Sequence, residues 1–370
     1  MKPLLLCLLL VLTLGSMSSQ AEAEAEFEPI ELPEPTGAFG VGTVTFFWTD
    51  ETRLFSYSSF QGDRRRIAVQ VWFPADGDGE ALEAPYAPLS SDYRHVTANS
   101  KLSPSFSPAV SVAPLILISP GRGVERYGYT AIAEELASRG FVVASVDMPG
   151  IGHVIYPDGY IASPDPQFRP SRELMSGPYE KVDEFFEEPT EIGRLDLELA
   201  LRNIRRLNEA DPTGRFVGKI DTTKIGIFGH SLGGRIAGAF AEKNESVEAY
   251  ISMEGIVPRR ARLQGLDMPV AMMCSSATWP YAKDNYQTVI DGRRNEVFMV
   301  ELVGFGHNSV TDFPFVTPAQ FSYSIDPSRG LSSSVQIVRA FFEAYLGGRD
   351  GFVDSLGALD DVVVTKYAAP

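Results

Sequence analysis

The sequence predicts an α/β fold in which a mostly parallel central sheet is covered by helices on both faces. Short, wholly apolar runs such as residues 115–119 (LILIS) and 141–147 (FVVASVD) have the length and composition of strands that are buried on both sides. Segments with helical spacing lie between such runs, and residues 191–208 are the most amphipathic of them. Strands and helices that alternate in this way are typical of a parallel sheet.

A secretory signal peptide is predicted at residues 1–21. An apolar run from Pro3 to Leu14 follows a single lysine, and the small residues Ala21 and Ala23 stand where a peptidase would cut. An uncleaved N-terminal anchor is the alternative. No later segment approaches the roughly 18 apolar residues of a membrane span, so no stable span is expected. Residues 22–36 are acidic and rich in proline and are expected to form an extended leader.

Residues 37–350 are predicted to form one α/β domain. Two β runs come first, at residues 43–49 and 66–74, and the Pro-, Ser- and Asp-rich residues 75–112 are expected to be a surface loop. The later strands are expected at residues 115–119, 141–147, 224–228, 247–253, 269–274 and 296–302, and helices at residues 129–139, 191–208 and 332–346.

Two further segments lack a regular pattern. Residues 149–190 are rich in glycine, proline and aromatic residues and are expected to be a loop-rich insertion. Their tyrosines and phenylalanines favour an apolar substrate site, although they would serve equally well to cover the core. Residues 351–370 are expected to form a C-terminal tail.

The composition excludes some classes of function. The formal net charge is −16, and it becomes −17 if Lys2 is lost with the signal peptide. Bulk charge therefore does not draw the chain to nucleic acid or to anionic lipid. Of the two cysteines, Cys7 lies in the predicted signal peptide, which leaves Cys274 without an intramolecular disulfide partner.

The segment from Ile227 to Gly238 (IFGHSLGGRIAG) carries the strongest functional signal. It passes from a predicted strand to a predicted helix through Gly229, Ser231 and Gly233, which form a Gly-X-Ser-X-Gly motif. In that context the motif is the nucleophile elbow of α/β hydrolases. The serine must project from a tight turn, and the two glycines are needed because side chains there would collide with the neighbouring strand and helix.

A serine nucleophile needs a base, and the order of residues along the chain points to one histidine. The four histidines are His95, His153, His230 and His307. Only His307 follows Ser231, and it lies just past a predicted strand, where this fold places its base. His230, next to the nucleophile, is expected to pack or to form hydrogen bonds, and His153 is a loop residue that could line the pocket.

The third member of the triad must hold the His307 ring, and two carboxylates remain open. Glu254 directly follows the predicted strand at residues 247–253, and Asp284 lies beyond the next strand. The oxyanion hole needs two backbone donors. We expect these donors to be the N–H of Leu232, which follows the nucleophile, and the N–H of Arg122, in the glycine-containing loop after residues 115–119.

With these residues in place, the sequence resembles the plasma and type II platelet-activating-factor acetylhydrolases and their bacterial relatives. The resemblance runs from about residue 36 to about residue 348. The segments that carry it are TGAFGVGTVTF, VQVWFPA, LILISPGRGVERYGYTAIAEELASRGFVVASVD, KIDTTKIGIFGHSLGG, SMEGIVP and GFGHNSVTDFPF.

The resemblance implies the α/β-hydrolase fold and a role for each site residue. Ser231 would be the nucleophile, His307 the base and Glu254 the acid, with Leu232 and Arg122 as the oxyanion donors. The chain has glutamate where the animal enzymes have aspartate, and this departure leaves Asp284 open as the acid. The segment between Asp147 and Leu195 also differs from the animal enzymes, so the resemblance does not define the substrate pocket or any contact with a lipid surface.

The expected function is that of a secreted or periplasmic serine carboxylic-ester hydrolase. It would cleave a short-acyl or lipid-like ester, with 1-alkyl-2-acetylglycerophosphocholine as one candidate. No metal or organic cofactor is expected, because the sequence has no HExxH, paired CxxC or phosphate-loop motif. A lipase or cutinase-like polyesterase and a serine peptidase are the alternatives. A non-catalytic binding protein is disfavoured because the serine, the histidine and the glycines are all present.

Overall fold

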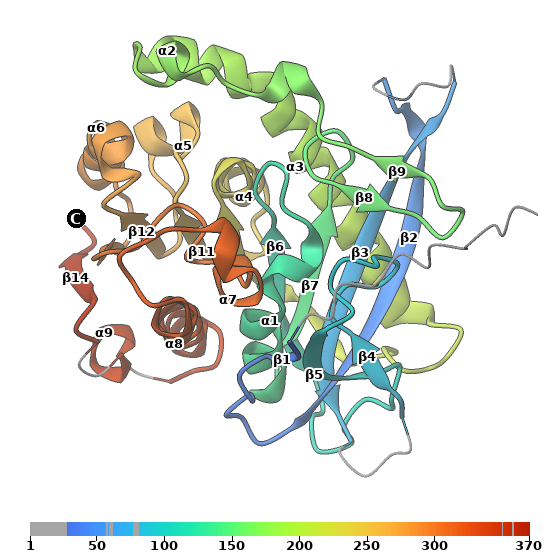
Figure 1. Cartoon of the computed structure of the whole chain (residues 1–370). Coiled ribbons are helices and arrows are strands. Elements are labelled where there is room, and N and C mark those ends of the chain that lie inside the picture. The colour runs from blue at the N-terminus through green and yellow to red at the C-terminus, as the bar shows by residue number, and fades with distance from the viewer. Residues whose placement is uncertain (1–27, 57, 59–61, 77–80, 350, 357–358) are drawn as a thin grey trace, which may run out of the picture.

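The computed structural model shows a large twisted sheet between two layers of helices (Figure 1). The described residues are 28–56, 58, 62–76, 81–349, 351–356 and 359–370. The predicted signal peptide at residues 1–21 lies outside them, as does most of the predicted leader. Within the described part of the chain, twelve strands belong to the main sheet, and two short strands form a separate hairpin.

The main sheet has a parallel centre and antiparallel flanks. The order across it is β1-β5-β2-β3-β7-β6-β10-β11-β12-β13-β14, with β4 paired to β5. The strands from β7 to β13 in that order run parallel, whereas β3 and β14 are antiparallel to their inner neighbours. The strand bounds are β1 (Ile30–Glu31), β2 (Gly40–Leu54), β3 (Arg64–Ala75), β4 (Glu83–Pro85), β5 (Val96–Leu102), β6 (Ala113–Ser119), β7 (Val142–Asp147), β10 (Ile220–His230), β11 (Val247–Met253), β12 (Val270–Ser275), β13 (Val297–Leu302) and β14 (Val362–Tyr367).

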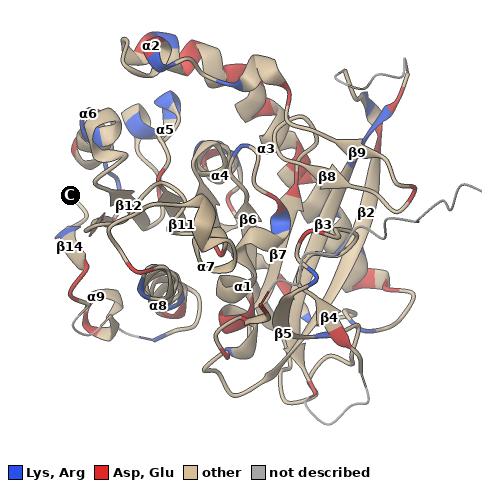
Figure 2. Ribbon diagram, in the orientation of Figure 1, with Lys and Arg blue, Asp and Glu red and all other residues tan. Residues whose placement is uncertain are grey.

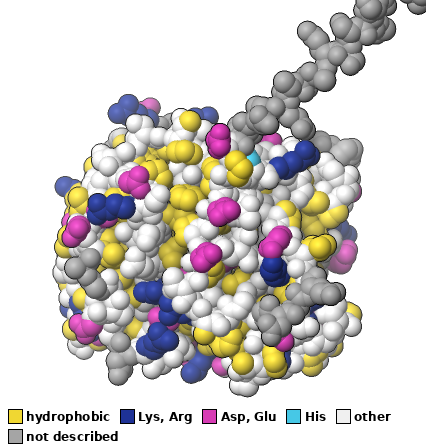
Figure 3. All heavy atoms as spheres, turned by 60° about the horizontal axis from the view of Figure 1, so that its bottom comes forward, with side chains coloured by type: hydrophobic (Ala, Val, Ile, Leu, Met, Phe, Trp, Pro, Cys, Tyr) yellow, Lys and Arg dark blue, Asp and Glu magenta, His cyan; other side chains and the backbone are white. Residues whose placement is uncertain are grey.

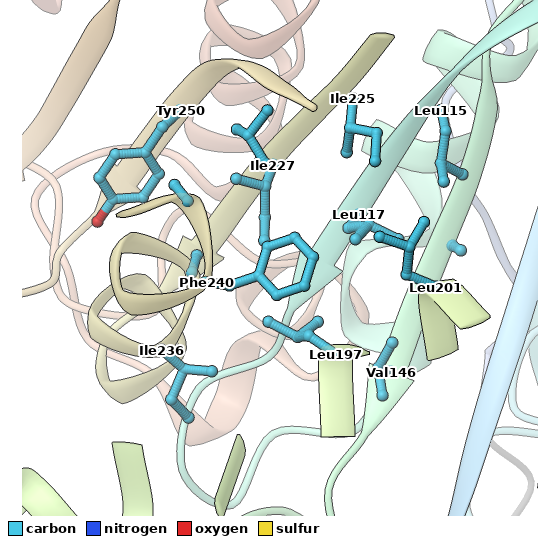
Figure 4. Close-up of a cluster of buried hydrophobic side chains, with 14 of the residues drawn as sticks. Leu115, Leu117, Val146, Leu197, Leu201, Ile225, Ile227, Ile236, Phe240 and Tyr250 are labelled. Carbon is cyan, nitrogen blue, oxygen red and sulfur yellow. The ribbon is translucent and has the colours of Figure 1, made fainter. Parts of the chain in front are cut away.

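The apolar central strands supply side chains to two separate cores. In β6, Leu115 and Leu117 face one helical layer, whereas Ile116 and Ile118 face the other. Such alternation with apolar residues on both faces requires helices on both sides. Figure 4 shows the first of these cores, in which strand residues pack against α3 and α4.

The helices divide between the two faces of the sheet. One layer contains α3 (Tyr179–Ala210), α4 (Leu232–Lys243), α5 (Arg259–Gln264) and α6 (Trp279–Asp291), and the other contains α1 (Thr130–Ser138), α8 (Pro327–Tyr345) and α9 (Phe352–Ser355). The short helix α7 (Phe313–Val316) lies in the loop before α8. Over the face drawn in Figure 3, charged side chains of both signs are scattered among hydrophobic ones, and no broad area carries a single sign.

The prediction of a surface loop at residues 75–112 is wrong, because this segment contains β4 and β5. The strand β5 was missed because its polar residues hide the pattern. The backbone N–H groups of Asn99 and Ser100 donate to the buried carboxylate of Glu134 in α1, at 3.0 and 2.8 Å. The nearby β1, within the predicted leader, pairs with β5. Contacts between distant parts of the chain therefore stabilise these edge strands.

The expected loop-rich insertion at residues 149–190 contains more regular structure than the sequence indicated. It includes the hairpin of β8 (Val154–Ile155) and β9 (Ile161–Ala162), the short helix α2 (Arg172–Met175) and the first turns of α3. Helix α3 begins at Tyr179 rather than at residue 191, and it continues through Pro189. Residues 170–190, which contain α2 and the first turns of α3, are called the arm. Figure 1 shows it crossing the top of the molecule above α5 and α6, and Figure 2 shows charges of both signs along it.

The expectation of a separate C-terminal tail at residues 351–370 is also corrected. Helix α9 packs Phe352 into the second core, and β14 pairs antiparallel with β13 along its whole length. This segment therefore completes one side of the sheet. The strand was not predicted because its alternating residues are only half-buried at the sheet edge.

Candidate active site

The turn between β10 and α4 holds Ser231 in a strained conformation. Its φ of 56° and ψ of −122° are unusual for a residue with a side chain. A Cβ atom on Gly229 would lie 2.1 Å from the carbonyl oxygen of Gly233, and one on Gly233 would lie 2.0 Å from the carbonyl oxygen of Ser119. The turn therefore requires glycine at both positions, as the motif indicated.

The loop after β13 brings His307 to this serine. The Nε2 atom of His307 lies 2.9 Å from the Ser231 Oγ atom. The two residues are 76 positions apart in the chain, and they meet because β10 and β13 end at the same edge of the sheet. This distance is that of a hydrogen bond between a nucleophile and its base.

The end of β11 places Glu254 on the other side of the imidazole. Its side chain is fully buried, and its Oε2 atom lies 3.5 Å from the Nδ1 atom of His307. The backbone N–H and the Oγ–H of Ser275 and the hydroxyl of Thr278 donate hydrogen bonds to this carboxylate. Glu254 also has a positive φ of 56°, so two neighbouring strands end in strained turns at the site.

Thr278 is a site residue that the sequence reasoning missed. Its Oγ1 atom donates to Glu254 and lies 3.2 Å from the Nδ1 atom of His307. A proton on Nδ1 can therefore be shared between the threonine oxygen and the carboxylate. The only signal for this residue was its place shortly after a predicted strand.

Asp284 lies elsewhere. It is on the exposed side of α6, and within the described residues no ion pair joins it to His307. The structure thus brings Ser231, His307 and Glu254 together and keeps Asp284 apart from them.

Leu232 and Arg122 were expected to supply the oxyanion donors. Leu232 is the first residue of α4, and the first turn of a helix leaves its N–H groups without intrahelical acceptors. Arg122 follows Gly121 in the loop after β6, and its N–H has no hydrogen-bond acceptor among the residues that the structure describes. Leu232 and Arg122 line the same cavity as Ser231. The two amides are therefore placed to donate to an oxyanion.

A buried hydrogen-bond chain links the Arg122 loop to the loop of His307. The Nε2 atom of His230 lies 2.8 Å from the carbonyl oxygen of His307, and its Nδ1 atom lies 3.0 Å from the hydroxyl of Tyr129. A carbonyl only accepts, so Nε2 carries the proton and Nδ1 accepts from the tyrosine. The N–H of Gly121 donates to the same hydroxyl, at 3.2 Å.

His230 therefore has the hydrogen-bonding role that its place in the motif suggested. Burial is the main cause that lowers the pKa of His230 to about 3, and the nearby His307 contributes to the same shift. The ring therefore stays neutral across the physiological pH range. A neutral ring keeps the donor and acceptor roles in these hydrogen bonds fixed. The Arg122 loop and the His307 loop are thereby held in a fixed position relative to each other.

The site opens into a cavity of about 380 Å³. Its lining residues come from the Arg122 loop, the arm, the elbow, the ends of β11 and β12, and the His307 loop. They are Arg122, Pro170, Met175, Phe186, Ser231, Leu232, Arg235, Glu254, Gly255, Ile256, Ala277, Thr278, Tyr281 and His307. His153 is not among them. Its pKa is lowered, mainly by burial and also by the nearby positive charge of Arg122.

The arrangement of these groups suits acyl transfer. A hydroxyl lies beside an imidazole, a buried carboxylate lies behind the imidazole, and the two residues expected to supply the oxyanion donors line the same cavity. Across the described ranges, no three His, Cys, Asp or Glu side chains are grouped so as to hold a metal ion. In the same part of the chain, no helix is long and apolar enough to cross a membrane.

The structure is similar to a solved enzyme of known fold. A ferulic acid esterase from Streptomyces cinnamoneus superposes with a TM-score of 0.73 at 24% sequence identity, over 90% of this chain and 99% of that one. At this level of identity the similarity establishes the fold, which is the α/β-hydrolase fold that the elbow motif predicted.

The model of one sequence family also matches the chain. It is described as platelet-activating factor acetylhydrolase, isoform II, and it matches residues 27–149 and 196–360. The match covers more than half of the chain and includes Ser231, His307 and Glu254, but it leaves out residues 150–195, which hold the arm. The chain thus belongs to the platelet-activating factor acetylhydrolase isoform II family, a family of carboxylic ester hydrolases.

Proposed function

We propose that the protein hydrolyses carboxylic esters through an acyl-enzyme formed on Ser231. The observation that carries the proposal is the 2.9 Å contact between the Oγ atom of Ser231 and the Nε2 atom of His307, at an elbow that the two glycines make possible. Membership of the family supports the same reaction class.

In this proposal the Ser231 oxygen attacks the ester carbonyl carbon while His307 Nε2 takes its proton. The carbonyl electron pair moves onto the oxygen, which accepts hydrogen bonds from the Leu232 and Arg122 amides. Collapse of this intermediate breaks the carbon–oxygen ester bond, and the protonated His307 gives its proton to the leaving alcohol. Water then attacks the acyl-enzyme with His307 as base, which releases the acid and restores the serine. Glu254 stabilises the imidazolium in both halves of the reaction.

Short-acyl or lipid-like esters are the proposed substrates. The cavity of about 380 Å³ has room for a short chain, and Met175, Phe186 and Ile256 give it apolar walls. The family name adds 1-alkyl-2-acetylglycerophosphocholine, the platelet-activating factor, as a specific candidate.

A chain-length series tests the proposal. p-Nitrophenyl esters from acetate to dodecanoate and short-acyl phosphatidylcholines are compared with Ser231→Ala as the matched variant. We expect wild-type turnover to be highest for the shorter acyl chains. Turnover by Ser231→Ala should fall to the background rate, and mass spectrometry of the wild type should find a fluorophosphonate adduct on Ser231. Equal turnover by wild type and Ser231→Ala would refute the mechanism.

We also propose that residues 1–21 direct export from the cytoplasm. The supporting observation is the apolar run from Pro3 to Leu14 with small residues after it. Cell fractionation and N-terminal sequencing of the full-length product provide the test. Recovery of an uncleaved chain in the cytoplasm would contradict this part of the proposal.

A further inference from the structure

Three buried ionic side chains meet where the arm packs on the catalytic core. Asp183 in α3 lies 2.8 Å from Arg235 in α4 and also forms an ion pair with Arg262 in α5. Arg235 donates a further hydrogen bond to Thr190, at 3.1 Å, and Arg262 donates to the carbonyl oxygen of Val257, also at 3.1 Å. The side chains of all three ionic residues are at most 10% exposed.

The cluster carries an excess of positive charge. It contains two guanidinium groups and one carboxylate, and within the described chain no other carboxylate pairs with either arginine. Glu254 lines the same cavity, but Ser275 and Thr278 occupy its oxygens. A buried cation without its own counterion is unfavourable unless some anion or polar group compensates it.

The cluster reaches the cavity through Arg235. Of the three ionic residues, only Arg235 lines the cavity. The lining also includes the apolar Met175, Phe186 and Ile256 and two charged residues, Arg122 and Glu254. Arg235 follows Ser231 by four residues, which is about one helical turn or roughly 5.4 Å along the axis. A ligand group beside Arg235 would therefore lie a short spacer away from the reacting carbonyl.

We propose that Arg235 forms a carboxylate-binding subsite and that the preferred substrates are esters that carry a second, ionised carboxyl group. Of its five N–H groups, the guanidinium gives one to the Thr190 hydroxyl, one to the Asp183 carboxylate and one, in a long contact of 3.5 Å, to the Asp183 carbonyl oxygen. The remaining N–H groups suit a carboxylate in a site with little water. The inference rests on the proposed ester hydrolysis and adds a substrate class to it.

The family match covers Arg235 but not the side chains that surround it in the arm. Both partners of Arg235, Asp183 and Thr190, belong to residues 150–195, which the family model leaves unmatched. Met175 and Phe186 belong to the same segment. The arm thus supplies both hydrogen-bond partners of Arg235 and part of the apolar lining beside it.

Matched esters separate charge from size. Monoethyl adipate is compared with the ethyl ester of adipic acid monoamide, which has nearly the same shape and no charge, and with ethyl hexanoate. In a second set the carboxylate or amide is placed on the alcohol part, as in the acetyl ester of 4-hydroxybutanoate and its amide. For whichever set places the anion in the cavity, we expect kcat/KM to be about tenfold or more higher for the carboxylate than for the amide.

Three variants test whether Arg235 causes the preference for the carboxylate. Arg235→Gln should bring the carboxylate-to-amide ratio close to one or below it, and Arg235→Lys should retain part of the preference. Asp183 keeps its ion pair with Arg262 in both variants, which favours folding. The control is Arg260→Gln, which makes the same charge change on α5 at a side chain that is 66% exposed and does not line the cavity. That variant should keep the wild-type ratio.

A measurement on the wild type alone keeps the inference testable if Arg235→Gln fails to fold. Adipate should inhibit hydrolysis of ethyl hexanoate competitively, and at least about tenfold more strongly than adipamide does. A carboxylate-to-amide ratio near one in both substrate sets, or a preference that Arg235→Gln leaves intact, would overturn the inference. Absence of hydrolysis for every ester, neutral ones included, would instead refute the proposed function.

Discussion

Replacement of Glu254 by glutamine is the most direct test of how the base is supported. The variant keeps the size of the side chain but removes the negative charge that lies 3.5 Å from the Nδ1 atom of His307. It also replaces one acceptor oxygen by an NH₂ group, which cannot accept from Ser275 or Thr278. We expect kcat to fall steeply while KM for a small ester changes little.

The magnitude follows from Coulomb's law. Two unit charges 3.5 Å apart attract by about 5 kcal/mol at an effective dielectric constant of about 20. The His307 side chain is 43% exposed, so solvent screens part of this attraction and leaves about 3–4 kcal/mol. Loss of that amount from the transition state corresponds to roughly a hundred- to thousandfold lower kcat.

The assay compares Glu254→Gln with Asp284→Asn on p-nitrophenyl acetate or butyrate, with circular dichroism and melting temperature as checks on folding. Asp284 is exposed on α6, so Asp284→Asn should stay within about twofold of wild type. The reasoning is refuted if folded Glu254→Gln retains more than a tenth of wild-type kcat, or if Asp284→Asn loses more than Glu254→Gln.

Three further predictions concern the residues around the site. Tyr129→Phe removes the hydroxyl that donates to His230, and we expect kcat to fall about tenfold while the protein stays folded, because two buried polar groups lose a partner. Steady-state kinetics checks this, and an unchanged kcat would exclude a positioning role for the hydrogen bonds through Tyr129 and His230. Gly233→Ala places a Cβ atom 2.0 Å from the Ser119 carbonyl oxygen, and urea unfolding should show a loss of more than about 4 kcal/mol or no folded protein at all. The pKa of buried Asp312 is raised by burial from 3.8 to about 7, so the folded state holds a proton there that the unfolded state releases, and stability contributed by this group falls as pH rises from about 4 to 7. Asp312→Asn should remove a slope of up to about 1.4 kcal/mol per pH unit over that range in urea unfolding, and identical slopes for wild type and variant would contradict the assignment.

The centre of the fold was predictable because its strands are chemically uniform. Strand β11 was expected at residues 247–253 and occupies Val247–Met253, and the predicted strands and helices around the elbow also formed. Apolar residues on both faces leave no alternative to burial between helices. The edges were not predictable, because β5 and β14 are held by partners that are distant in the sequence.

Helix α3 shows a different limit. Proline inside a helical pattern normally marks a boundary, and Pro189 precedes the start that the sequence indicated. The helix nevertheless extends back to Tyr179, because Asp183 and Phe186 pack onto the core through their side chains. Tertiary contacts here outweigh the local preference.

The site was predictable in its parts but not in its connections. Chain order pointed to His307 without any knowledge of distances. Strand ends left Glu254 and Asp284 both open as the acid, and only the family resemblance pointed to Glu254. Thr278 and Tyr129 could not be identified, because the importance of each depends on which atoms stand on either side of it. Hydrogen-bond bridges of this kind leave no pattern in a single sequence.

The arm gives this enzyme two regions with opposite tolerance to mutation. Around the nucleophile, main-chain atoms crowd one another so closely that the glycines admit no substitution. The arm contributes only side chains such as Met175 and Phe186 to the cavity wall. Laboratory evolution aimed at new substrates should therefore concentrate its libraries on Met175, Phe186 and their neighbours in the arm, and should keep Asp183, the buried counterion of Arg235 and Arg262.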